Sequence, residues 1–169
     1  MSEPNGRRGE WTYNPSRGFP RVVPILFYED VEVAISWLSR VFGFNELLRV
    51  VCEGGWIAHA DLELENGVIM LDAARGDYAP RKDYRKPILD GHVCSYTFVC
   101  VEDVDKHFER ARAEGATIVY PPEDKEWGLR QYTAKDYEGH TWEFSQHIGD
   151  PPPEEWEATT AHATGEFRP

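Results

Sequence analysis

The tetrapeptide EDVE at positions 29–32 returns as EDVD at positions 102–105, and this repetition decides the fold of the chain. A run rich in β-branched and aromatic residues precedes each copy, VVPILFY at 22–28 and VCSYTFVCV at 93–101. Runs of this composition predict strands. The repeated tetrapeptide therefore marks the same place twice, the end of a strand.

A helix is predicted directly after each copy of the tetrapeptide. Asp30 and Asp103 are suitable N-cap residues, because a carboxylate accepts hydrogen bonds from the free backbone amides of a first helical turn. Apolar residues then recur at helical spacing until Gly43 in the first half and Gly115 in the second, and glycine commonly ends helices. The two halves therefore share one strand-to-helix junction.

Three further strands are predicted behind each helix. In the first half they lie in 44–52 and on both sides of the turn signal Asn66-Gly67. In the second half they lie in 116–121 and on both sides of a turn at 136–139. The spacing between the two N-caps and the spacing between the two hairpin glycines differ by one residue, which indicates an internal duplication.

The predicted fold class is α+β, with two tandem β-α-β-β-β modules whose mixed sheets line a ligand-binding cleft. Module one spans residues 21–74, a connection with several basic side chains spans 75–91, and module two spans 92–148. Residues 1–20 and the acidic, proline-containing stretch 149–169 lack periodicity and are predicted tails.

The composition narrows the classes of function. A net charge of −12 repels phosphate backbones, so nucleic-acid binding is disfavoured, whereas cationic small molecules are tolerated or attracted. No apolar run approaches the ~20 residues of a membrane span, and the start lacks the apolar stretch of a secretory signal, so a cytoplasmic location is expected. The cysteines, odd in number and without CxxC spacing, argue against disulfides or structural zinc.

Two longer motifs lie inside the repeated units, EDVEVAISWLSRVFGFNELL early and KDYEGHTWEFSQ late. With the duplicated β-α-β-β-β order, they resemble the vicinal oxygen chelate superfamily, in its glyoxalase and bleomycin-resistance branch. The resemblance covers residues 21–147. It implies a paired-module fold and a homodimer, sometimes completed by exchange of modules between subunits.

The resemblance also implies four places where metal-dependent members hold a divalent ion, on the first and last strand of each module. Counting from the N-caps and the hairpins puts Val23, Leu71, Tyr96 and Glu143 at these places. Valine and leucine have no donor atom, and only Glu143 is an ordinary ligand. No metal cofactor is therefore expected.

Glu143 is a candidate for catalysis and for ligand binding. It alternates along its strand with Trp142 and Phe144, and the resemblance implies that it faces the cleft, where a carboxylate holds a cation or acts as a base. The alternative is a structural bond to Arg130 or to a neighbouring hydroxyl.

His59 is the second candidate catalytic residue. It shares a predicted strand face with Asp61 and Glu63, and a carboxylate can hold an imidazole in one tautomer for general-base chemistry or metal binding. The alternative, a polar strand face without chemistry, is the more common fate of such a pattern.

Aromatic side chains are the remaining candidates for ligand contact. Phe27, Tyr96, Phe98 and Trp127 occupy possible cleft positions, where flat rings bind planar or cationic ligands by stacking and cation–π attraction. Core packing is the alternative for each ring. Trp127 stands apart because it borders a glycine in a loop-like stretch, EWGL.

These observations favour a small-molecule binding protein, a homodimer that sequesters an aromatic or cationic compound without metal. The alternative is a lyase, isomerase or dioxygenase with a relocated divalent metal such as Ni, Zn, Mn or Fe, or a metal-free catalyst using His59 and Glu143. A metal-dependent enzyme requires at least two side chains to lie within coordination range of one ion, from the set His59, His92, His140, His147 and Glu143. A third possibility is partner docking through the tryptophan-bearing tails.

Overall fold

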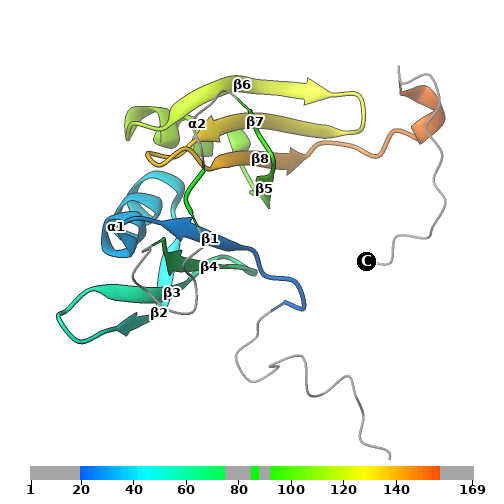
Figure 1. Cartoon of the computed structure of the whole chain (residues 1–169). Helices are drawn as coiled ribbons and strands as arrows, with labels where there is room; N and C mark the ends of the chain where they lie inside the picture. Colours follow the sequence, from blue (N-terminus) through cyan, green and yellow to red (C-terminus); the bar gives the residue numbers. More distant parts are fainter. Residues whose placement is uncertain (1–19, 75–84, 88–91, 157–169) are drawn as a thin grey trace, which may run out of the picture. The chain divides into compact units, whose positions relative to one another are not determined.

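The computed structural model describes residues 20–74, 85–87 and 92–156. The chain divides into two compact units, residues 1–87 and residues 88–169, and each unit holds one sheet and one principal helix (Figure 1). The strand-rich α+β prediction and the duplication are confirmed, because both units have the element order β-α-β-β-β.

The first unit contains β1 (Ile25–Tyr28), α1 (Val31–Phe42), β2 (Asn45–Val51), β3 (Ile57–Leu64) and β4 (Gly67–Ala73). Its sheet has the order β1-β4-β3-β2, with β1 parallel to β4 and the other pairs antiparallel. The β3–β4 turn has Glu65 and Asn66 at its centre, and Gly67 already pairs with Leu64. The turn predicted at Asn66-Gly67 therefore lies one residue earlier, and Glu65 takes the positive φ of 51°.

Local capping explains where α1 begins and ends. The Asp30 carboxylate accepts hydrogen bonds from the backbone amides of Glu32 and Val33, at 3.0 and 3.1 Å. Gly43 follows the helix in the left-handed conformation, with φ 86°, which costs glycine little. One stripe of the helix is buried, made up of Val31, Ala34, Ile35, Leu38, Val41 and Phe42.

The two faces of the first sheet differ in character. Ala60 pairs with Leu71 and Leu62 with Ile69, and all four side chains are buried and apolar. Since neighbours along a strand point to opposite faces, His59 lies on the other face. The apolar face is the one that can bury the stripe of α1, so the polar residues occupy the helix-free face.

The second unit contains β5 (Tyr96–Cys100), α2 (Val104–Ala113), β6 (Thr117–Lys125), β7 (Leu129–Lys135), β8 (Thr141–His147) and the short 3-10 helix η1 (Pro153–Glu155). Its sheet repeats the first topology, with the order β5-β8-β7-β6 and β5 parallel to β8. Asp103 caps α2 by accepting from the Lys106 amide at 2.9 Å. Both predicted N-caps are therefore confirmed.

Aromatic rings form the core between α2 and its sheet. Tyr132 on β7 stacks on Phe144 of β8, with ring centroids 5.1 Å apart. From α2, His107 lies 4.2 Å from the Phe144 ring and its Nδ1 lies 2.7 Å from the Tyr132 hydroxyl. Burial raises the pKa of the Tyr132 phenol. Phe144 and Trp142 thus face the helix, which leaves Glu143, between them, on the helix-free face.

One buried carboxylate organises the turn between β7 and β8. Asp136 Oδ1 accepts from the backbone amides of Glu138, Gly139 and His140, at 2.9–3.0 Å. Its Oδ2 accepts from the indole N–H of Trp142 at 3.0 Å. One side chain therefore holds both the turn and the first core residue of β8 in place.

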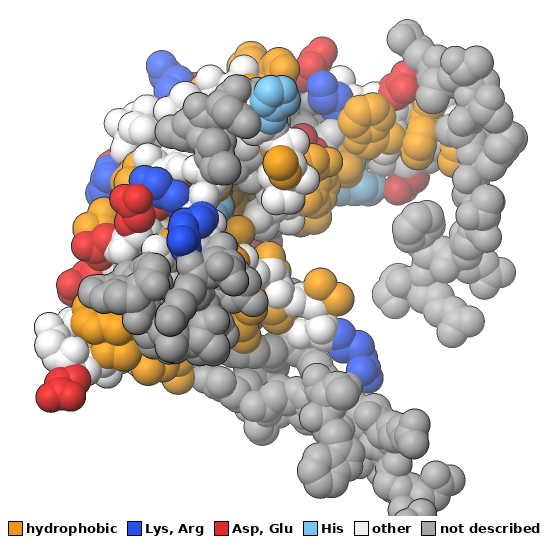
Figure 2. Space-filling view, in the orientation of Figure 1, with side chains coloured by type: hydrophobic (Ala, Val, Ile, Leu, Met, Phe, Trp, Pro, Cys, Tyr) orange, Lys and Arg blue, Asp and Glu red, His pale blue; other side chains and the backbone are white. Residues whose placement is uncertain are grey.

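None of the helices in the described ranges is long and apolar enough to cross a membrane. Hydrophobic side chains nevertheless remain visible among the charged ones on the surface of the described parts (Figure 2). The exposed large hydrophobic residues of the second unit include Tyr96, Phe98 and Trp127.

Candidate functional site

The helix-free face of the second sheet brings exposed rings beside a carboxylate. Phe98 on β5 is the direct partner of Glu143 on β8, and Tyr96 lies two residues along β5 on the same face. Tyr96 is 57% exposed, Phe98 45% and Trp127 41%. Large rings left this open to solvent at a sheet face offer stacking surface to a ligand.

Trp127 is connected to Glu143 by a chain of hydrogen bonds. Its indole N–H donates to Gln131 Oε1 at 3.1 Å, and Gln131 Nε2–H donates to Glu143 Oε1 at 2.8 Å. The orientation of the amide follows from its neighbours, because an indole only donates and an ionised carboxylate only accepts. Gln131 therefore fixes Oε1 of Glu143, and this is the one side-chain hydrogen bond of Glu143 within the described residues.

Two further polar groups lie beside this carboxylate. Gln131 is buried and pairs across the strands with Ser145, which is also buried. Within the described ranges the Ser145 hydroxyl makes no hydrogen bond. Buried polar groups are nearly always satisfied in folded proteins, so this hydroxyl is an exception on the strand face of Glu143.

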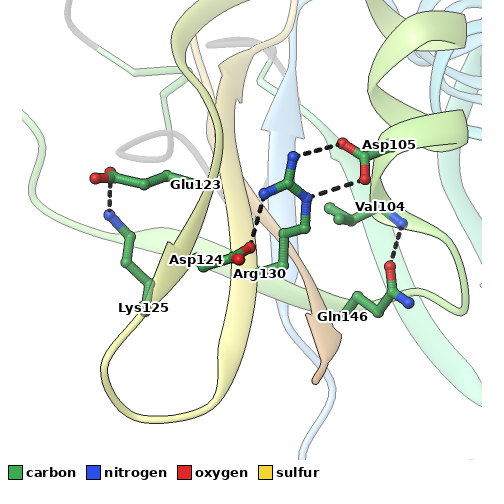
Figure 3. A network of polar contacts seen from close by, with 7 residues as sticks. All are labelled: Val104, Asp105, Glu123, Asp124, Lys125, Arg130 and Gln146. Carbon is green, nitrogen blue, oxygen red and sulfur yellow. Dashed lines mark hydrogen bonds and ion pairs between the residues drawn. The ribbon is translucent and has the colours of Figure 1, made fainter. Parts of the chain in front are cut away.

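Arg130, the predicted structural partner of Glu143, bonds to other carboxylates. It forms a two-bond contact with Asp105 of α2, 2.9 Å for each bond, and a third bond of 2.7 Å with Asp124 of β6 (Figure 3). This guanidinium holds the pKa of the Asp105 carboxyl below its usual range. The predicted alternative of a structural bond from Arg130 to Glu143 is therefore wrong.

His59 has a different environment in the first unit. Its Nδ1 lies 2.7 Å from Asp72 Oδ1 and its Nε2 lies 2.9 Å from Asp61 Oδ1. Asp61 is 1% exposed and Asp72 2%. Both ring nitrogens are therefore engaged by carboxylates of the protein itself. The geometry is that of an internal polar cluster.

The register of the sheets corrects two of the four predicted metal positions. Phe27 pairs with Asp72 just as Phe98 pairs with Glu143, so Asp72 is the counterpart of Glu143. Leu71, which was placed there by counting, is fully buried on the opposite face of its sheet. By the same register Ile25 is the counterpart of Tyr96, so Val23 is also misplaced. Counting from the N-caps failed because the connection from Phe98 to Asp103 is longer than that from Phe27 to Asp30. Counting from the hairpins misplaced Leu71 because the β7–β8 turn is longer than the β3–β4 turn.

The donor set does not fit the divalent metal that the resemblance implies for some relatives. Neither the predicted Val23 nor Ile25, the register counterpart of Tyr96, has a donor atom. Tyr96 offers a phenol where a metalloenzyme places a stronger donor. Of the two carboxylates, Asp72 is bound to His59. Among the described residues, no three His, Cys, Asp or Glu side chains are grouped so that they could hold a metal ion.

The predicted site residues thus divide between the units. Tyr96, Phe98 and Glu143 lie on one sheet face, joined by Trp127 through Gln131. Phe27 and His59 belong to the first unit, on its helix-free face. Gln131 and Ser145 were not predicted from the sequence. Each is next to a core aromatic residue in its strand, Tyr132 or Phe144, so strand alternation could have placed both on the helix-free face.

The first unit also has an open hollow of about 300 Å³ beside the start of α1. Glu29, Asp30, Glu32 and Trp56 line it. Its acidic groups are already engaged within the protein, because Lys86 Nζ lies 2.9 Å from Glu29 and Arg49 lies 3.7 Å from Glu32. Asp30 is the helix cap described above. The hollow therefore offers less unneutralised charge than the face that carries Glu143.

Comparison with known proteins places this geometry in a family. A family model described as "Glyoxalase/Bleomycin resistance protein/Dioxygenase superfamily" matches residues 18–144. The crystal structure of TioX from Micromonospora sp. ML1 is 45% identical, with a TM-score of 0.60 over 75% of this chain and 98% of that one. An uncharacterized protein of Mycobacterium bovis is 32% identical over 129 residues, 76% of this chain and 84% of its own.

A more distant structure shares the fold alone. The genomically encoded fosfomycin resistance protein FosX of Listeria monocytogenes is 15% identical, with a TM-score of 0.54 over 75% of this chain and 92% of that one. At this identity the likeness concerns the arrangement of helices and strands and not the residues of a site.

Proposed function

The chain belongs to the glyoxalase/bleomycin resistance protein/dioxygenase superfamily, and from this premise we propose that it binds a planar, cationic small molecule and so sequesters it. The site is the helix-free face of β5 and β8, with Trp127 at its border. The observation that carries the proposal is Glu143, whose Oε1 is held by Gln131 while exposed rings stand beside it.

The two kinds of contact have complementary roles. A cation over an exposed ring gains about 0.5–1 kcal/mol, and more where water is excluded. A hydrogen bond from a cationic donor to a carboxylate contributes about 1.5–3 kcal/mol. Glu143 therefore supplies charge selectivity and Tyr96, Phe98 and Trp127 supply area. The net charge of −12 adds a general attraction for cations.

Sequestration requires no reaction, so the proposal assigns no catalytic step. Binding alone protects a cell when the bound compound is held away from its target. We propose that this occurs without metal, because the donor set described above is poor for a divalent ion. A homodimer in the cytoplasm, which the family resemblance and the sequence suggest, is part of the same proposal and is tested by analytical ultracentrifugation and by cell fractionation.

The proposal is tested with proflavine, a planar aromatic cation, by isothermal titration calorimetry. We expect Glu143→Gln to weaken binding about tenfold or more, because about 1.4 kcal/mol corresponds to a factor of ten. Glu123→Gln is the matched control, since it removes the same charge from the same unit at an exposed pair with Lys125. Anthraquinone-2-sulfonate, a planar anion, should bind less tightly than proflavine.

Three results would overturn the proposal. The first is equal affinity for the planar cation and the planar anion. The second is equal loss in the two glutamate variants, since the effect would then come from net charge alone. The third is loss of proflavine binding after dialysis against EDTA, which would point to a metal-dependent function.

A further inference from the structure

The turn that carries Trp127 is built around a glycine. β6 ends at Lys125 and β7 begins at Leu129, and the Gly128 amide closes the turn by donating to the Lys125 carbonyl at 3.0 Å. Gly128 has φ +82°, a conformation that other residues adopt only with strain. Trp127 therefore lies in a turn whose shape depends on Gly128.

The chain after β8 returns to this same glycine. The amides of Ile148 and Gly149 both donate to the Gly128 carbonyl, at 2.9 and 3.2 Å. A Cβ at position 128 would lie 1.9 Å from the Gly149 carbonyl oxygen and 2.8 Å from Cδ of Pro151. Two backbones thus meet where a side chain would otherwise be, and only glycine permits so close an approach.

The returning segment has a structure of its own. His147 Nε2 lies 2.8 Å from Asp150 Oδ1, and the Trp156 indole donates to the Pro151 carbonyl at 3.2 Å, around the 3-10 helix η1. The segment lies beyond residue 144, where the match to the family ends. It contacts the turn that carries Trp127, a predicted ligand contact.

We propose that Gly128 and the segment 148–151 are positioning elements of the binding face. Their contact sets the place of Trp127, one peptide away. Trp127 sets the amide of Gln131, and Gln131 sets the carboxylate of Glu143, through the two hydrogen bonds of 3.1 and 2.8 Å. The inference rests on the proposed function, since it names what orients that site.

The test uses Gly128→Ala in the full-length chain, with Gly115→Ala as the control. Gly115 has φ +96° in the same unit, but a Cβ there meets nothing within 4 Å, so the control carries the backbone strain without the clash. We expect Gly128→Ala to weaken proflavine binding about tenfold. We expect Gly115→Ala to leave the affinity within about twofold of the parent protein.

A double-mutant cycle separates positioning from general damage. If Gly128 acts through Glu143, the losses in Gly128→Ala and Glu143→Gln are not additive, because the double variant has little more to lose. Additive losses, or an equal loss in Gly115→Ala, would overturn the inference while leaving the proposed function in place.

A measurement without ligand keeps the inference testable by itself. In ¹H–¹⁵N spectra, the indole N–H of Trp127, assigned with Trp127→Phe, and the side-chain amide of Gln131 should shift in Gly128→Ala and stay in place in Gly115→Ala. Unmoved signals would contradict the inference even if proflavine binds. If these signals move and proflavine does not bind, the proposed function fails and the structural coupling stands.

Discussion

The two halves of the chain keep one plan and use it differently. In each, a phenylalanine of the first strand pairs with a carboxylate of the last strand, Phe27 with Asp72 and Phe98 with Glu143. Asp72 is almost fully buried and bound to His59. Glu143 stands beside exposed rings, with one oxygen held by an amide.

The difference between the two carboxylates depends on the neighbouring strand. Asp72 lies opposite His59 on β3, whereas Glu143 lies opposite Thr133 on β7. A buried charge is tolerated only when the protein pairs it, so the histidine turns the first carboxylate into a structural group. Threonine brings no charge, so the second carboxylate keeps its capacity to attract a cation. A duplicated face has thus become one closed and one open site.

The largest expected effect comes from removing His59, the partner of the carboxylate in the first unit. His59→Ala leaves Asp61 and Asp72, both nearly buried, without the imidazole that hydrogen-bonds to both, and we expect the free energy of unfolding to fall by about 3 kcal/mol. Urea denaturation measures this. His147→Ala is the control, because its pair with Asp150 is exposed and should contribute less than about 1 kcal/mol. Equal losses of stability in the two variants would show that Asp61 and Asp72 do not depend on His59 for the stability of the fold.

A smaller effect is expected from giving Glu143 a partner inside the protein. Thr133→His places an imidazole opposite Glu143, in the arrangement that His59 has with Asp72. We expect proflavine affinity to fall about tenfold, because the carboxylate gains a competing partner inside the protein, which corresponds to about 1.4 kcal/mol. Thr133→Gln is the control for size. If the histidine variant binds as tightly as the glutamine variant, the opposite residue does not decide the role of the carboxylate.

The smallest effect concerns an exposed ion pair in acid. Arg130 lowers the pKa of Asp105, so the pair stabilises the fold above the ordinary carboxyl pKa of about 3.9, and this contribution is lost as pH falls through the lowered value. We expect the urea midpoint of Arg130→Gln to lie below that of the parent protein at pH 5, with a smaller gap at pH 2. A gap that widens in acid would contradict the assignment.

Much of the fold could be predicted because its signals are local. An N-cap, a helical stripe and a turn each depend on a few consecutive residues, so Asp30 and Asp103 marked the duplication correctly. Strand alternation likewise placed Glu143 on the face opposite Trp142 and Phe144.

The site could be predicted only in part, because pairing between strands depends on loop lengths. Leu71 was placed one residue from the true counterpart of Glu143, since the β7–β8 turn is longer than the β3–β4 turn. The bond from Gln131 to Glu143 runs diagonally between β7 and β8, and such neighbours become known only when the register is known.

The Asp136 turn has a consequence for the order of folding. The four hydrogen bonds described for its carboxylate join it to residues 138–142. These local contacts allow the β7–β8 hairpin to close within about 1–10 μs. The parallel pairing of β5 with β8 joins Tyr96 to Thr141 and must first overcome the entropy of closing a long loop. We therefore expect the second unit to assemble from its last hairpin backwards, with Glu143 in its strand before the rings of β5 arrive beside it.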